Sequence, residues 1–511
     1  MNNNNQIISK SSLSLKSLSN LMSDEFNHKA VFLITIDALN LKHLNIYGYD
    51  RNTAPNLEKY VKQGSIFFNA VSNGPETPSA FSAIFTSVLP FLEGGYSPLP
   101  SQKITFPQIL KENKIFTLGI HSNPNLGEFY NYHRGFNTFL DGERYKSDII
   151  SDKHVNMKQR ISFFLKKIFD YKDILKKLLY RIPGVNKTKD FLRKKVPLIT
   201  ELLLPITPMA YNAPYIVNKI ELLLKEVQKP LFFWAHFMDL HSPYNPPSDN
   251  IRKYRNTDFT LSEKEFLNRH LYQNPKKYMI TPEVFKDYNI LYDAQINFLD
   301  EYLGKLFRVI EAHFKNDCLI IITADHGESL LDFGLTGHQG SIHDDLLKIP
   351  LFIIEIGKKK NKSTINDIAQ SIDIPCTILD YYGIEIPETY RGKSLIPLLR
   401  DSPIKNESFI ISECFQKGGL LKRNTKEGYK LISIKANKFK YIFDEERDKE
   451  FLFDIQSDPS EKKNLVEKFP SKLDEFRRIK DDHLQEVFQS SDEKLKIIRA
   501  ISTLKKSIGS K

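Results

Sequence analysis

Four short runs in the chain are almost entirely apolar and rich in β-branched and aromatic residues: Val31–Ile36, Leu231–Ala235, Cys318–Thr323 and Leu351–Ile354. Such runs are typical of strands buried on both faces, which occur mainly in parallel sheets covered by helices. Helical patterns lie between them, as in Tyr288–Leu306. The sequence therefore predicts an α/β fold with a mostly parallel central sheet flanked by helices, where ligands bind at the carboxyl ends of strands.

The character of the sequence changes several times along the chain. The first residues are rich in Asn and Ser and lack a continuous apolar stretch, so we expect a disordered leader. Phe409–Ser412, Lys430–Ile434 and Lys440–Phe443 alternate as antiparallel strands do, which indicates a small α+β subdomain. The expected segments are a leader over 1–27, a main domain over 28–400 with a helical insertion at about 145–225, the subdomain over 401–475, and a charged helical tail over 476–511.

One segment carries almost all of the excess positive charge. The formal net charge is +11, and residues 158–195 hold thirteen Lys and Arg residues against three Asp residues. One interpretation is a solvated helical lid, and the other is a set of amphipathic helices that bind an anionic membrane surface. Nucleic acid is disfavoured as a partner, because basic and aromatic residues do not alternate along a strand-like surface.

Cysteine usage and hydropathy exclude several classes of protein. Cys318, Cys376 and Cys414 are widely spaced, which excludes a disulfide framework and a thiolate metal site. The sequence has no run of 18 consecutive apolar residues, so we expect no membrane-spanning helix. We therefore expect a cytoplasmic protein, or one attached peripherally at the inner membrane face if the basic segment binds lipid.

Polar residues that could bind a metal follow two of the predicted strands. Asp37 comes directly after Val31–Ile36, and the pair Asp325-His326 follows Cys318–Thr323 closely. Carboxylate oxygen and imidazole nitrogen are common metal ligands, so these residues could converge on one cation. An Asp after a strand is also a common helix N-cap, and Asp-His-Gly could form a simple turn. Spacing alone leaves both interpretations open.

Thr77 lies between a Gly-Pro turn and a helix-compatible stretch. A hydroxyl at the start of a helix is near backbone N–H groups that favour an anion. The alternative is an ordinary N-cap with Pro78 at the first helical position, and on this ground alone it fits better. Four histidines (His236, His241, His338 and His343) also lie near predicted strand ends and indicate an anion- or metal-binding pocket.

Several longer motifs resemble one family. They are ITIDALNLKHLNIYGYDRNTAPNLEKY, TPSAFSAIFTS, FFWAHFMDLHSPYNPP, YDAQINFLDEYLGKL, ITADHGESLLDFGLTGHQGSIHDDLLKIPLFI, DIPCTILDYYGI and FLFDIQSDPSEKKNL. In this order, from about residue 30 to 470, the sequence resembles the sulfatase family of the alkaline-phosphatase-like superfamily, whose members are metal-dependent ester hydrolases and transferases. The resemblance implies that the main domain is catalytic.

The resemblance also implies roles for individual residues. Asp37, Asp325 and His326 fall at metal-ligand positions. Thr77 stands where the family keeps its nucleophile, which also binds the metal. His241 and His338 fall where members contact the transferred group or the leaving oxygen, and His121, His236 and His338 are expected to contact substrate.

Departures from the family pattern narrow the expected chemistry. Type sulfatases mature Cys or Ser into formylglycine within a Cys-x-Pro-x-Arg frame, but here the frame begins with Thr77 and Phe81 replaces the Arg. Ala38 stands where a second Asp is usual. The sequence instead resembles the threonine-nucleophile branch of phosphoglycerol and phosphoethanolamine transferases. An imidazole ligand favours manganese or zinc as the divalent metal, with magnesium or calcium as alternatives.

The resulting expectation is a metal-dependent hydrolase or transferase that acts on sulfuric or phosphoric esters through a covalent Thr77 intermediate, with phosphoryl-type transfer favoured. The substrate would be a small-molecule or lipid- or glycan-linked anionic ester. The alternatives are an arylsulfatase-like sulfuric ester hydrolase without formylglycine, and a catalytically inactive sulfatase-like binding protein.

Overall fold

The computed structural model describes residues 29–92, 98–101, 103–142, 212–227, 229–338, 340–357, 363–402, 409–416 and 429–508. The expected leader, the basic segment 158–195 and most of the expected insertion lie outside the described residues.

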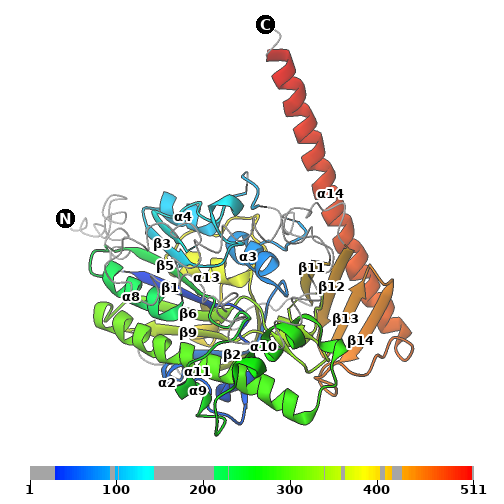
Figure 1. The fold of residues 1–511 in the computed structure, drawn as a ribbon. Helices are drawn as coiled ribbons and strands as arrows, with labels where there is room; N and C mark the ends of the chain where they lie inside the picture. Colours follow the sequence, from blue (N-terminus) through cyan, green and yellow to red (C-terminus); the bar gives the residue numbers. More distant parts are fainter. Residues whose placement is uncertain are drawn as a thin grey trace, which may run out of the picture.

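A mostly parallel sheet forms the centre of the main domain, as the sequence predicts (Figure 1). Its eight strands lie in the order β10-β2-β9-β6-β1-β5-β3-β4. β9 alone runs antiparallel to its neighbours among the described strands of this sheet. The strands are β1 (Ala30–Ile36), β2 (Ser65–Val71), β3 (Phe116–His121), β4 (Thr138–Asp141), β5 (Leu231–Phe237), β6 (Cys318–Ala324), β9 (Leu351–Ile356) and β10 (Ser363–Gln370).

Helices cover both faces of this sheet (Figure 1). One layer contains α2 (Pro55–Val61), α8 (Ala213–Leu223), α9 (Ser248–Ile251) and α11 (Pro282–His313), and the other contains α3 (Thr77–Thr86), α4 (Phe106–Glu112) and α13 (Asp373–Tyr381). The sequence dictates the start of α11, because the Thr281 side chain accepts a hydrogen bond from the Val284 N–H and Pro282 occupies the first turn. β1, β5 and β6 are buried over their whole length between the layers, which explains their almost entirely apolar sequences.

A four-stranded antiparallel sheet follows the main domain in the chain. Its strands are β11 (Ile410–Gln416), β12 (Tyr429–Ala436), β13 (Phe439–Asp444) and β14 (Lys449–Asp454), paired in sequence order. Alternating sequence patterns predict the first three of these strands, and β14 was not predicted. α14 (Pro470–Ile508) packs Leu473 and Phe476 into the core of this sheet and then extends beyond it (Figure 1).

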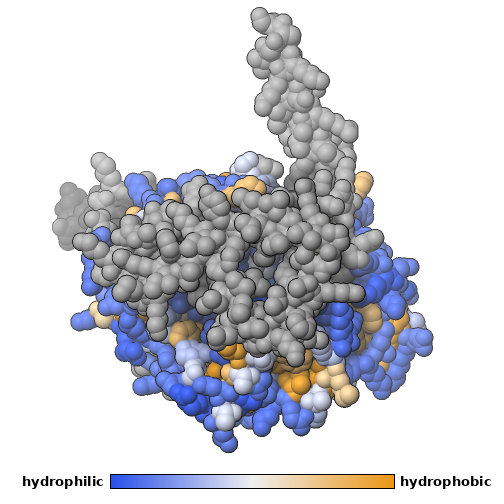
Figure 2. Space-filling view, viewed as in Figure 1, coloured by the Kyte–Doolittle hydropathy of each residue, from blue (hydrophilic) through white to orange (hydrophobic). Residues whose placement is uncertain are grey.

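On the face shown in Figure 2, most of the visible surface of the described residues is hydrophilic. Apolar side chains on this face gather in small areas separated by hydrophilic ones (Figure 2). No helix in the described ranges is both long and apolar enough to cross a bilayer. Two further short strands, β7 (Ser329–Leu330) and β8 (Thr336–Gly337), lie in the segment that follows β6.

Candidate active site

The two predicted carboxylates leave the central sheet side by side. β1 and β6 are parallel neighbours, and Ile36 pairs with Ala324, so Asp37 and Asp325 occupy adjacent positions at the same edge. Ala38 turns the chain there with a φ of +55°, and its N–H donates to Asp325 Oδ1 at 3.3 Å. Both carboxylates are fully buried. Parallel pairing therefore brings together two residues that are 288 positions apart in the chain.

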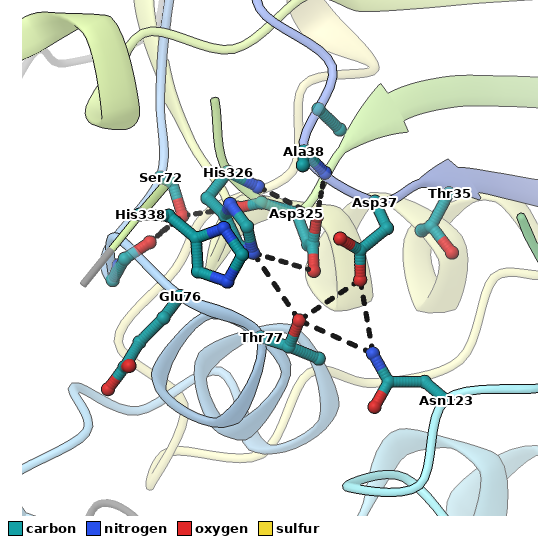
Figure 3. Close-up of polar contacts among 12 residues, drawn as sticks. Thr35, Asp37, Ala38, Ser72, Glu76, Thr77, Asn123, Asp325, His326 and His338 are labelled. Carbon is teal, nitrogen blue, oxygen red and sulfur yellow. Dashed lines mark hydrogen bonds and ion pairs between the residues drawn. The ribbon is translucent and has the colours of Figure 1, made fainter. Parts of the chain in front are cut away.

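Thr77 lies at the same edge, at the first residue of α3 (Figure 3). Glu76 is the N-cap of this helix, so the Thr77 hydroxyl is not its capping group. Thr77 Oγ1 donates to Asp37 Oδ2 at 3.1 Å and lies 3.3 Å from His326 Nε2. The structure thus brings Asp37, Thr77, Asp325 and His326 into one buried cluster.

The donor set of this cluster fits a divalent cation. One ligand atom from each of Asp37, Asp325 and His326 lies within 4.8 Å of the others. Asp37 Oδ1 and Asp325 Oδ2 are buried and accept no hydrogen bond from the described residues. His326 Nδ1 donates to the Gly327 carbonyl oxygen at 2.8 Å, which leaves a lone pair on Nε2 inside the cluster. Buried carboxylate oxygens without donors are costly unless a cation neutralises them.

The pKa values of the residues in this cluster also favour a bound cation. Burial would raise the pKa of Asp37, but His236, His241 and His326 together hold it well below its usual range. Burial and the Asp37 charge raise the pKa of Asp325 well above its usual range. Burial and the neighbouring His338 lower the pKa of His326 to about 3, so its ring is neutral. Two buried carboxylates can both ionise here at low cost only with a bound cation.

His338 and His241 form one wall of the site. The His338 ring centroid lies 4.4 Å from that of His326 and 5.3 Å from that of His241. His241 Nδ1 donates to the Ser242 carbonyl oxygen at 2.7 Å. His338 Nδ1 lies 3.5 Å from Glu328 Oε2, and although burial alone would lower its pKa, Glu328 raises it to about 9. At neutral pH His338 is therefore a cation that can donate a proton.

His236 and His121 lie behind Asp37. His236 Nε2 is 3.5 Å from Asp37 Oδ2, and His236 Nδ1 is 3.0 Å from Thr35 Oγ1. Burial, together with His236, lowers the pKa of His121 to about 3, and its ring stacks on Trp234. Phe81, at the position of the family's Arg, contacts the His236 ring edge-on. These residues form a largely apolar wall, in which the His121 ring is neutral.

One predicted residue does not join the site, and two unpredicted residues do. His343 forms an ion pair with Glu461 and stacks on Phe333, so its described ring contacts do not include the other three histidines or the proposed ligands. Asn123 Nδ2 donates to Asp37 Oδ2 at 3.1 Å and lies 3.4 Å from Thr77 Oγ1. Glu328, two residues after His326, is fully buried beside His338. Asn123 follows the carboxyl end of β3, and this position was the signal that could have identified it.

Comparison with known proteins identifies the family. A family model described as sulfatase matches residues 29–384, and one described as N-sulphoglucosamine sulphohydrolase, C-terminal, matches residues 338–489. An arylsulfatase of Clostridium perfringens is 25% identical over 268 residues, covering 50% of this chain and 53% of that protein. The multifunctional alkaline phosphatase superfamily protein PehA of Trinickia caryophylli is 36% identical over 112 residues, 22% of either chain.

Solved structures share the fold. The phosphonate monoester hydrolase of Agrobacterium radiobacter superposes with a TM-score of 0.64 at 17% identity, covering 90% of this chain and 96% of the other. The chain spans about half or less of the length of the curated relatives described above. The sulfatase model nevertheless matches well over half of this chain. The chain belongs to the sulfatase family.

Proposed function

We propose that this protein cleaves or transfers the anionic group of a phosphoric or sulfuric ester, with Thr77 as nucleophile. The observation that carries the proposal is the position of Thr77 Oγ1, which lies 3.1 Å from Asp37 and 3.3 Å from His326 within a buried set of cation ligands. The hydroxyl caps no helix, and its contacts with ligand residues are those required of an activated nucleophile.

The residues that would hold the cation are Asp37, Asp325, His326 and Thr77. A bound divalent cation supplies positive charge that offsets negative charge on the ester oxygens and favours deprotonation of a nearby hydroxyl. Manganese or zinc suits the mixed carboxylate and imidazole donors. Thr77 Oγ1 directs its proton to Asp37 Oδ2, which orients the oxygen for attack.

The rest of the reaction uses groups on the same wall. The Thr77 oxygen forms a bond to phosphorus or sulfur while the bond to the leaving oxygen breaks. His338, protonated at neutral pH and held by Glu328, or His241 donates the proton that the leaving oxygen takes. The N-terminal N–H groups of α3 favour the transferred anion. Water or an acceptor alcohol then cleaves the threonine ester and restores the hydroxyl.

Phosphoryl-type transfer is the favoured chemistry, because Thr77 and Phe81 replace the formylglycine frame of type sulfatases. A second candidate is hydrolysis of sulfuric esters without formylglycine, which the arylsulfatase relative favours. The substrate would be a small or glycan- or lipid-linked anionic ester. An inactive binding protein would not need Thr77, Asp37, Asp325 and His326 together.

The test compares nitrophenyl phosphate, a nitrophenyl phosphonate monoester and nitrophenyl sulfate as substrates of the purified protein loaded with manganese or zinc. We expect Thr77→Ala to lower kcat by at least about 10³-fold, because alanine has no hydroxyl to attack the ester. Thr86→Ala is the matched control, since the Thr86 hydroxyl donates to Ser82 at the far end of the same helix. Equal losses in both variants would contradict the assignment, and faster sulfate turnover would favour the second candidate.

A further inference from the structure

The segment that carries Thr77 is attached at both ends to one residue of the C-terminal sheet. This nucleophile segment comprises residues 73–91, with α3 at its centre. At its start, the Glu413 N–H on β11 donates to the Asn73 carbonyl oxygen at 2.9 Å. At its end, the Phe91 N–H donates to Glu413 Oε2 at 2.7 Å. Glu413 is fully buried and therefore bridges the two ends of the segment.

Asn73 is fixed by hydrogen bonds on every polar group it has. Its Nδ2 donates to the Ile411 carbonyl oxygen on β11 at 2.9 Å and to Gln370 Oε1 at 3.0 Å. Its Oδ1 accepts from Ser371 Oγ and from the Ile372 N–H, and its own N–H donates to Ser371 Oγ. Three residues separate Asn73 from Thr77, so a shift of this anchor moves the hydroxyl relative to Asp37 and His326.

His483 on α14 holds Glu413 from the other side. Its Nε2 forms a buried ion pair with Glu413 Oε1, while Oε2 accepts from Phe91. The two carboxylate oxygens are therefore shared between the C-terminal helix and the nucleophile segment. A buried carboxylate satisfied in this way has few alternative positions.

We propose that Glu413, oriented by His483, is a positioning residue that clamps both ends of the nucleophile segment and sets the place of the Thr77 hydroxyl in the site. β11, through Glu413, thus contributes to the position of the nucleophile. The inference rests on the proposed role of Thr77 as nucleophile. The alternative is that the ion pair only fastens α14 to its sheet.

Glu450 provides a matched control for that alternative. It also pairs with a cation of α14, since Arg477 Nη2 lies 2.5 Å from Glu450 Oε2, and it accepts from the Tyr441 hydroxyl. Glu450 lies on β14, and its described contacts are with the C-terminal sheet, with Asn464 after β14 and with α14, not with the nucleophile segment. A change there removes one contact of α14 and leaves the hydrogen bonds of Glu413 to Asn73 and Phe91 in place.

The experiment measures kinetics and hydrogen–deuterium exchange in the full chain for Glu413→Ala, Glu413→Gln and Glu450→Ala. We expect Glu413→Ala to lower kcat by about 10- to 100-fold with little change in KM, and to speed exchange in residues 73–91. Glu413→Gln, which can still accept from Phe91, should recover most of the rate. Glu450→Ala should leave both readouts close to those of the unchanged protein.

Equal kcat values in Glu413→Ala and Glu450→Ala, or an equal rise of exchange in residues 73–91, would overturn the proposal. If Glu413→Ala does not fold, His483→Gln takes its place and Arg477→Gln becomes the control. We then expect a lower kcat in His483→Gln alone. An active Thr77→Ala protein contradicts the proposed nucleophile, whereas the exchange comparison tests the clamp by itself, so the two failures are distinguishable.

Discussion

Asn123 is the residue outside the proposed ligand set that most directly supports Asp37. Its amide donates to Asp37 Oδ2, the oxygen that also accepts from Thr77. We expect Asn123→Ala to lower kcat/KM and metal affinity by about 10- to 100-fold, the usual effect of losing a residue that orients a ligand. Steady-state kinetics and titration calorimetry with manganese or zinc measure the two quantities.

The control for this prediction is Asn113→Ala, because the Asn113 amide donates to the Ile109 carbonyl oxygen on α4. Asn123→Asp should be worse than Asn123→Ala, since it places a further carboxylate against Asp37. Full metal affinity in Asn123→Ala would show that Asp37 needs no such donor.

Individual residues differ in how far the sequence reveals them. The meeting of Asp37 with Asp325 and His326 could be predicted, because each directly follows the carboxyl end of an apolar strand and parallel strands present these ends at one edge. Asn123 also follows the carboxyl end of a strand, but its residue type adds no signal to that position, since asparagines serve in many turns and caps. His343 lies five residues after His338, yet its ring pairs with Glu461, which lies 118 residues further along the chain and could not be identified as its partner from the sequence.

At the scale of elements, the contact between α14 and β11 should depend on pH. Burial would lower the pKa of His483, but Glu413 outweighs it and raises the pKa above its ordinary value. The protonated form is then bound more tightly in the folded protein than in the unfolded chain. Its stabilisation is fully present below about pH 6.5 and is lost as pH rises through the raised value.

The measurement is the difference in urea midpoint between the unchanged protein and His483→Gln. We expect this difference to shrink as the pH rises above about 6.5, because the histidine loses its charge as the pH passes its raised pKa. Both proteins share their other titrating groups, so the difference between their urea midpoints at each pH excludes the contribution of those groups. A difference that stays constant or grows with pH would contradict the charged pair.

Some strands could be predicted from the sequence pattern, and others could not. β1, β5 and β6 were predictable because they are buried on both faces and read as continuous apolar runs. A continuous apolar run does not indicate strand direction, so the antiparallel direction of β9 could not be predicted from Leu351–Ile354. β14 was missed because its six residues directly precede a turn-rich stretch and include two charged residues at their start.

At the scale of the molecule, the site connects segments from distant parts of the chain. The sulfatase match ends at residue 384 and the C-terminal match begins at residue 338, so the two matched regions overlap on the chain. The hydrogen bonds of Asn73 and Glu413 join them physically. We therefore expect metal binding at the site to change the free energy of unfolding of the whole protein.

Asp37 and Asp325 each have one buried oxygen that accepts no hydrogen bond from the described residues, and this gives the response a definite sign. In the absence of a cation, Asp325 must either remain charged beside Asp37 or take up a proton at neutral pH, and both lower the stability of the folded state. We therefore expect Asp325→Asn to unfold at a higher urea concentration than the unchanged protein when both are treated with chelator. Manganese or zinc at about 1,000 times Kd should stabilise the unchanged protein by about 4 kcal/mol and leave Asp325→Asn almost unaffected.

Asp300 separates this effect from the general loss of a buried carboxylate. It is also buried, but its oxygens accept from the N–H groups of Asn56 and Leu57 and from the Asn56 amide. Asp300→Asn should therefore lower stability with and without metal while leaving the metal-induced gain intact. If Asp325→Asn is less stable than the unchanged protein in chelator, or if metal still stabilises it fully, the cluster does not bind its cation through Asp325.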